Sequence, residues 1–118
     1  MIDFATEIKR LLDEYGDEVM DVLEEEAQKV AKKAAKKLQE TSPKQPGGGG
    51  YAKGWTSKYD KTAKTAIVYN AKKQGLAHLL EHGFQGRSGV HPAIVHIAPV
   101  EEAASDEFVE AVERRLTQ

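Results

Sequence analysis

The feature that most constrains the fold is a long amphipathic pattern near the N-terminus. Apolar residues recur at spacings of three and four from Phe4 to Leu38, which is the period of one face of an α-helix. Asp3 is a suitable N-cap and Pro43 stops the pattern, so the sequence predicts a helix over residues 3–40, about 54 Å long. Gly16 is its weak point, because a glycine inside a helix costs about 1 kcal/mol relative to alanine, and any kink is expected there.

A single helix of this length offers more surface than the rest of a 118-residue chain can cover. Beyond Ala27 its apolar stripe narrows to alanines, and such small residues allow another element to approach closely. The surplus face must then be exposed or be buried by another copy, and on this ground we predict a homo-oligomer.

Two segments of contrasting character follow this helix. Residues 44–50 contain one glutamine, one proline and four glycines, which predicts a mobile loop. Residues 51–70 alternate around a central turn and predict an antiparallel hairpin with Trp55 in the core. As an alternative, the aromatic and basic side chains of this hairpin could bind nucleic acid; they are Tyr51, Lys53, Trp55, Lys58, Tyr59, Lys61 and Lys64.

The last part of the chain predicts a short helix, a loop, a strand and a final helix; these cover residues 75–83, 84–92, 93–98 and 100–116. Pro92 and Pro99 bracket the strand, which predicts an edge position in the sheet. The final helix has acidic residues in its first turn and arginines in its last, as the helix dipole favours. The expected fold is a single α+β domain, in which the long N-terminal helix and the C-terminal helix pack on an antiparallel sheet of about three strands.

The short helix carries the only pattern that suggests catalysis. His78, Glu81 and His82 have the His-x-x-Glu-His spacing of a zinc peptidase motif, which would place both imidazoles on one helix face. The same helix is explained by an apolar stripe that needs polar residues opposite it. Since a zinc enzyme also needs a third ligand and a substrate cleft, we expect no catalytic residue, no metal and no cofactor, and keep a zinc hydrolase as an alternative.

Charge is strongly segregated along the chain, although the net charge is only −2. Acidic residues dominate residues 1–26 and 99–118, and lysines dominate residues 29–73. This pattern allows contact with phosphates, or contact between acidic and basic faces of neighbouring subunits. The chain has no cysteine, and no apolar run approaches the roughly 20 residues of a membrane span, so we predict no disulfide and no membrane contact.

Five short motifs together resemble one known family. They are Thr-Ser-Pro at 41–43, Tyr-Ala-Lys-Gly-Trp at 51–55, Val-Tyr-Asn at 68–70, His-Leu-Leu-Glu-His-Gly at 78–83 and His-Ile-Ala-Pro-Val-Glu-Glu at 96–102. In this order they resemble the small tail-completion, or head–tail joining, proteins of long-tailed bacteriophages and prophages. The chain departs from the family pattern in its four-glycine run at 47–50 and in a loop whose only basic side chain apart from histidine is Arg87.

The resemblance implies a non-enzymatic virion protein at the head–tail junction, made in the cytoplasm of the bacterial host. Its implied partners are other head-connector and tail proteins, with the chain itself assembled as a homo-oligomeric ring; contact with DNA in the channel is not predicted. From composition and expected exposure, the residues predicted to contact partners are Lys44, Gln45, Arg87, Ser88 and His91. A small nucleic-acid-binding module and a host-encoded helical adaptor remain as alternatives.

Overall fold

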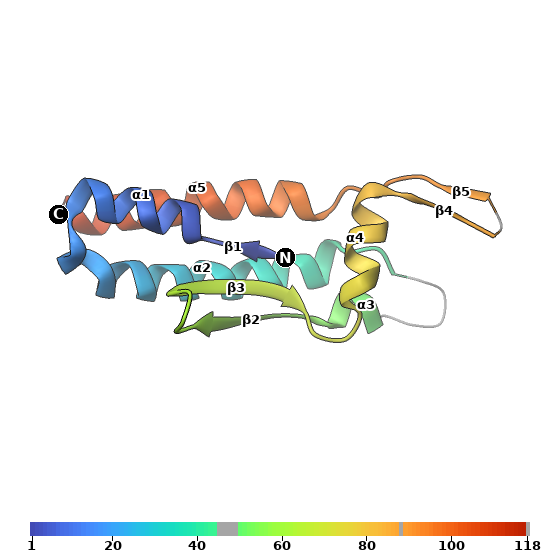
Figure 1. Ribbon diagram of the computed structural model, residues 1–118, viewed down its shortest axis with the longest axis horizontal. Coiled ribbons are helices and arrows are strands. Elements are labelled where there is room, and N and C mark those ends of the chain that lie inside the picture. The colour runs from blue at the N-terminus through green and yellow to red at the C-terminus, as the bar shows by residue number, and fades with distance from the viewer. Residues whose placement is uncertain (45–49, 88, 118) are drawn as a thin grey trace.

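The structure is a computed structural model that describes residues 1–44, 50–87 and 89–117 (Figure 1). The helices are α1 (Ala5–Tyr15), the 3-10 turn η1 (Asp17–Val19), α2 (Met20–Thr41), α3 (Gly50–Lys53), α4 (Gln74–His82) and α5 (Ile97–Leu116). The strands are β1 (Ile2–Asp3), β2 (Trp55–Asp60), β3 (Thr65–Asn70), β4 (Phe84–Gly86) and β5 (Gly89–His91). Helices flanking a small antiparallel sheet make this an α+β fold, as the sequence predicts.

The long N-terminal pattern forms two helices rather than one, so the prediction of a single helix over residues 3–40 is wrong. Gly16 has φ 92°, a backbone conformation that side-chain-bearing residues rarely adopt, and its N–H closes α1 by donating to Leu12 O at 2.8 Å. The chain reverses through η1, so that α1 and α2 run antiparallel (Figure 1). The weak point at Gly16 is therefore a full turn between helices.

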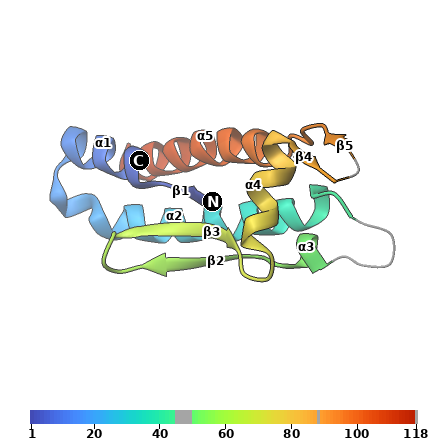
Figure 2. The ribbon, with the colours of Figure 1, turned by 45° about the vertical axis from the view of Figure 1, so that its right-hand side comes forward.

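Helix α2 forms the middle layer of the molecule. The sheet packs on one side of it, and α1 and α5 lie on the other, as Figures 1 and 2 both show. Its buried side chains include four alanines, which let both layers approach; they are Ala27, Ala31, Ala34 and Ala35. Because α5 and the sheet pack on α2, most of the apolar stripe of this helix is buried within the chain and does not by itself require another copy.

The sheet has the strand order β1-β3-β2, with both pairs antiparallel. The predicted hairpin is present as β2 and β3, although Tyr51–Lys53 belong to the helical turn α3 instead of a strand. The third strand is β1, where Ile2 pairs with Val68, and not the predicted edge strand at 93–98. Of that segment, residues 92–96 carry no regular structure, and α5 already begins at Ile97, three residues earlier than predicted.

The core lies between these layers and contains few large side chains. Phe4 and Phe108 pack with ring centroids 5.2 Å apart, and both are almost fully buried. Trp55 is also buried, as expected, and its indole N–H donates to Ser42 Oγ at 2.9 Å. No helix in the described ranges is both long and apolar enough to cross a membrane.

Candidate functional site

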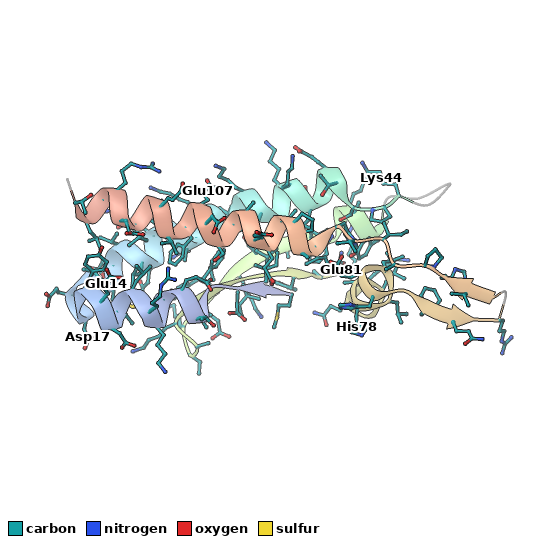
Figure 3. The ribbon with its side chains drawn as sticks, turned by 90° about the horizontal axis from the view of Figure 1, so that it is seen from above. Glu14, Asp17, Lys44, His78, Glu81 and Glu107 are labelled. Carbon is teal, nitrogen blue, oxygen red and sulfur yellow. The ribbon has the colours of Figure 1, made fainter. Side chains whose placement is uncertain are left out.

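The His-x-x-Glu-His helix is a structural joint. His78 and His82 lie on the exposed side of α4 with ring centroids 4.7 Å apart, whereas Glu81 is buried. The Glu81 carboxylate accepts hydrogen bonds from the backbone N–H groups of the first residues of α5, which are His96 at 2.8 Å, Ile97 at 2.9 Å and Ala98 at 3.0 Å. No side chain of α5's own N-cap residue does this, so Glu81 caps α5 from another helix (Figure 3).

Because of this arrangement, Glu81 is not suited to act as the general base of a zinc hydrolase. Burial raises the pKa of Glu81, but the three backbone N–H donors outweigh burial and hold the pKa below its ordinary value. A carboxylate that is ionised and engaged in three hydrogen bonds cannot readily accept a proton from a metal-bound water. Among the described residues, no group of three or more potential ligand side chains is placed to hold a metal ion.

His96 ties the same joint to α3. Its Nδ1 lies 2.6 Å from Ile94 O, and because a carbonyl can only accept, Nδ1 carries the proton. Its Nε2 then accepts from the Tyr51 hydroxyl at 2.7 Å. Burial and the nearby Glu81 charge raise the pKa of Tyr51 to about 12, which keeps that hydroxyl protonated as a donor. The two motifs that contain histidine, at 78–83 and 96–102, thus both supply side chains to the packing of α3, α4 and α5.

None of the three aromatic residues named in the nucleic-acid alternative is exposed. Tyr51 and Trp55 are buried, and the hydroxyl of half-buried Tyr59 donates to Glu24 at 2.8 Å. Lys58 lies over the Tyr69 ring, 5.1 Å from its centroid. The lysines of the hairpin remain exposed, but the stacking platform of the nucleic-acid alternative is absent from this part of the described chain.

The segment predicted to be a loop at 84–92 is instead a two-stranded hairpin, β4–β5, that projects from one end of the molecule (Figure 1). We call residues 84–87 and 89–95 the arm. At its base Ile94 N donates to Leu80 O at 2.7 Å, and Gly83 has φ 78°. A Cβ at Gly83 would meet Ala93 N at 2.8 Å, so the two ends of the arm close tightly on each other.

The predicted contact residues that the structure describes, Lys44, Arg87 and His91, lie at this same end of the molecule. Arg87 is exposed at the turn of the arm, and His91 is exposed but its ring stacks on Phe84 with centroids 4.5 Å apart. Lys44 is exposed just after α2 (Figure 3). Gln45, Ser88 and most of the predicted mobile loop at 44–50 lie outside the described residues, and Gly50 belongs to α3.

Sequence reasoning missed the exposed apolar residues of the arm. Val90, Ile94 and Val95 are 76%, 46% and 60% exposed. The prediction of an edge strand at 93–98 implied that part of this segment is buried in the sheet. Because of that error, the exposure of its apolar side chains was not expected. The proline on each side of the segment was the available clue, because neither residue can donate to a strand ladder.

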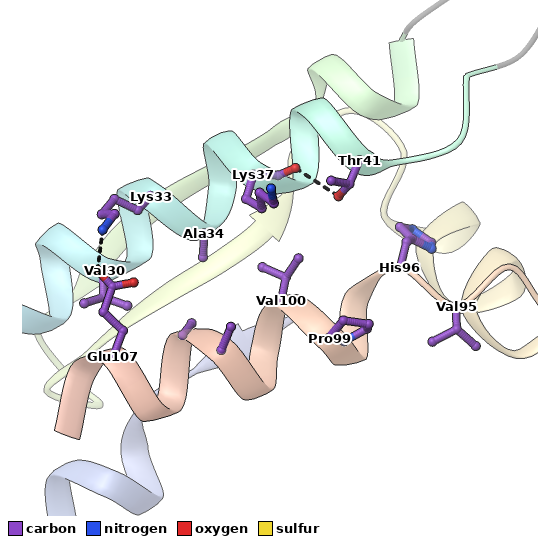
Figure 4. A pocket seen from close by; sticks show the side chains of 12 residues that line it. Val30, Lys33, Ala34, Lys37, Thr41, Val95, His96, Pro99, Val100 and Glu107 are labelled. Atoms are coloured by element: carbon purple, nitrogen blue, oxygen red, sulfur yellow. Dashed lines mark hydrogen bonds and ion pairs between the residues drawn. The ribbon is translucent and has the colours of Figure 1, made fainter. Parts of the chain in front are cut away.

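An apolar groove of about 470 Å³ opens beside the base of the arm, between α2 and α5 (Figure 4). Val30 and Ala34 of α2 face Val100 and Ala104 of α5 across it. Lys33 of α2 forms an ion pair with Glu107 of α5 at one end, and Val95 borders the other. The groove exists because the alanines of both helices leave the space unfilled.

Some of the oppositely charged residues of the sequence form ion pairs within the chain. Besides Lys33 and Glu107, Arg115 of α5 pairs with Glu25 of α2 at 2.8 Å and Glu26 at 3.4 Å. The hydrogen bond from Arg115 lowers the pKa of the Glu25 carboxyl. Much of the acidic face of α5 and the lysine face of α2 nonetheless remains open to solvent.

Comparison with known proteins gives one match. Residues 6–83, from α1 to the end of α4, match the model of a family described as "Bacteriophage HK97-gp10, putative tail-component". Neither a curated protein nor a solved structure matches the chain. The matched stretch is more than half of the 118 residues.

Proposed function

Since the chain belongs to the HK97 gp10-like family of bacteriophage tail components, we propose that it is a non-enzymatic structural protein that completes the tail or joins it to the head connector. The family match carries this proposal, and the architecture supports it. Glu81, the candidate base of the zinc motif, instead caps α5 at the α4–α5 joint. The projecting arm instead presents apolar and basic side chains suited to contact with another protein.

We place the protein at the head–tail junction of the virion after synthesis in the cytoplasm of the bacterial host. Its partners there are other connector and tail proteins, and the chain assembles with them as a homo-oligomeric ring. The contact residues we propose are those predicted from the sequence, namely Lys44, Gln45, Arg87, Ser88 and His91. Lys44 and Arg87 are exposed at the end of the molecule that carries the arm, which supports a contact through this end.

The test is deletion of the gene from the phage or prophage that encodes it, followed by electron microscopy of the particles. We expect heads and tails to accumulate unjoined, and a plasmid-borne wild-type copy to restore joined particles. A copy in which a neutral linker replaces residues 85–90 should fail to restore them. Normal numbers of joined, infectious particles after deletion would overturn the proposal.

A further inference from the structure

The exposed side of α4 carries two histidines that the packing of the α4–α5 joint does not use. His78 and His82 lie about one helical turn apart, and their ring centroids are 4.7 Å apart with an interplanar angle of 52°. Both side chains are exposed (Figure 3). Within the described ranges, the hydrogen bonds and the ion pair of imidazole nitrogens all belong to His96. The rings of His78 and His82 are therefore open to a ligand from solution.

The backbone that carries this pair is held by its neighbours in the fold. Between the two histidines in sequence, Leu80 O accepts a hydrogen bond from Ile94 N at 2.7 Å, and the Glu81 carboxylate accepts three from the start of α5. These contacts fix the turn of α4 that presents both rings. Two ligands on a fixed helical turn lose little conformational freedom when they bind one ion.

The separation of the rings matches chelation of one metal ion. A metal–imidazole bond is about 2.0–2.1 Å long, which places the ring centroid about 3.2 Å from the ion. When a nitrogen of each ring faces the same ion, centroids 4.7 Å apart correspond to an angle of about 95° at the ion. Tetrahedral ligands, about 109° apart, would place the centroids about 5.2 Å apart. The pair is therefore closer to neighbouring positions of a square-planar or octahedral ion.

This geometry favours Ni²⁺ or Cu²⁺ over the zinc of a hydrolase. Both ions bind imidazole nitrogen well and accept square-planar or tetragonal coordination. Protein zinc sites instead use three or four side chains arranged as a tetrahedron. Among the described residues no third ligand side chain joins the pair, so an ion held here keeps water at its other positions.

The surroundings of the pair favour a cation. Both histidines line a hollow of about 310 Å³ between α4 and the start of α5, and the exposed side chain of Glu101 lines it as well. Neither lysine nor arginine is among the described residues that line this hollow. A positive ion bound by the two imidazoles is therefore attracted by a nearby carboxylate and repelled by no side chain of the same hollow.

We propose that His78 and His82 together bind one divalent transition-metal ion of the Ni²⁺ or Cu²⁺ type on the surface of α4. One ring nitrogen of each histidine is a ligand, and water completes the coordination. The inference does not rest on the proposed function, and it assigns no catalysis to the ion.

Isothermal titration of the purified protein with NiCl₂ tests the site. The protein is prepared without a polyhistidine tag and studied at about pH 8, where free imidazole is neutral. The variants are His78→Ala and His82→Ala, both at exposed positions, and circular dichroism checks that each is folded. The matched control is His91→Ala, which removes an exposed histidine of the arm. MgCl₂ is the control ion, because Mg²⁺ prefers oxygen ligands and would report only attraction to carboxylates.

We expect the wild type and His91→Ala to bind one Ni²⁺ ion per chain with the same affinity. Either change in the pair should weaken binding by about tenfold or more, since loss of even an outer-shell partner costs a metal site about 10–100-fold. Binding of Ni²⁺ that is unchanged in both His78→Ala and His82→Ala would overturn the inference. Equal binding of Mg²⁺, or no binding of Ni²⁺ by the wild type, would overturn it as well.

Discussion

The α4–α5 joint and the arm adjoin in sequence but differ in how their side chains are used. In the joint, buried Glu81 accepts three hydrogen bonds and His96 is held at both ring nitrogens. In the arm, one aromatic stack and a short strand pair leave Val90 and Arg87 exposed. Glu81 and His96, which could be taken for catalytic groups, are therefore structural, whereas Val90 and Arg87 of the arm are available for contact.

The largest difference in stability is expected when a phenylalanine ring is removed from the core in one variant and from the arm in another. Phe108→Ala is expected to lower the free energy of unfolding by about 4 kcal/mol, because its buried ring fills the core against Phe4. Phe84→Ala, in the arm, is expected to cost less than about 1 kcal/mol. Chemical denaturation of both variants measures the difference, and similar losses would show that the arm belongs to the cooperative core.

Removal of the Glu81 cap is expected to have the next largest effect. Glu81→Ala leaves three backbone N–H groups at the start of α5 without their acceptor, which should cost about 3 kcal/mol. Glu81→Gln retains one side-chain oxygen and should cost less. Arg87→Ala is the matched change of a charged residue in the arm and should leave the unfolding midpoint unchanged; a loss comparable with that of Glu81→Ala would contradict the assignment.

Acid should weaken the joint through the same carboxylate. Because the folded protein holds the pKa of Glu81 below its ordinary value, its contribution is complete above the ordinary glutamate pKa of about 4.3 and declines as pH falls through the folded pKa. Glu7 acts in the opposite sense, because burial raises its pKa. Comparison of wild type with Glu81→Gln cancels Glu7, and we expect their difference in unfolding free energy to shrink from pH 7 to pH 3. A difference that does not depend on pH would contradict this account.

The sequence predicted the fold class, the β2–β3 hairpin, the burial of Trp55 and the family, all of which are confirmed. These features rest on local alternation and on the order of motifs along the chain. The same local signals could not show that the chain reverses at Gly16, because the helical period continues on both sides of it. The turn lets α1 lie beside α5, a helix far away in the sequence (Figures 1 and 2).

The candidate site was located only in part for the same reason. Arg87 and His91 were identified from loop composition, and their segment is the exposed arm. The role of Glu81 depends on backbone N–H groups about 15 residues further along the chain, and no spacing rule indicates such a pair. The groove is equally invisible in sequence, since it is empty space left between alanines of two separate helices.

The smallest effect on stability, and the most informative for the arm, is expected from Val90→Asp. Val90 is 76% exposed and contacts no core residue, so the free energy of unfolding should change by less than about 0.5 kcal/mol. Self-association should weaken by about tenfold or more, because an ionised carboxylate would replace an apolar side chain at the contact that we propose for this end of the molecule. Sedimentation velocity over a range of concentrations measures this change in self-association.

Leu79→Asp is the matched control, because Leu79 is an exposed apolar residue of α4 outside both the arm and the groove. If the two variants associate equally well, Val90 makes no contact with a partner. Arg87 would then be the only side chain of the arm that still supports a role in contact, in contrast to the structural role of the α4–α5 joint.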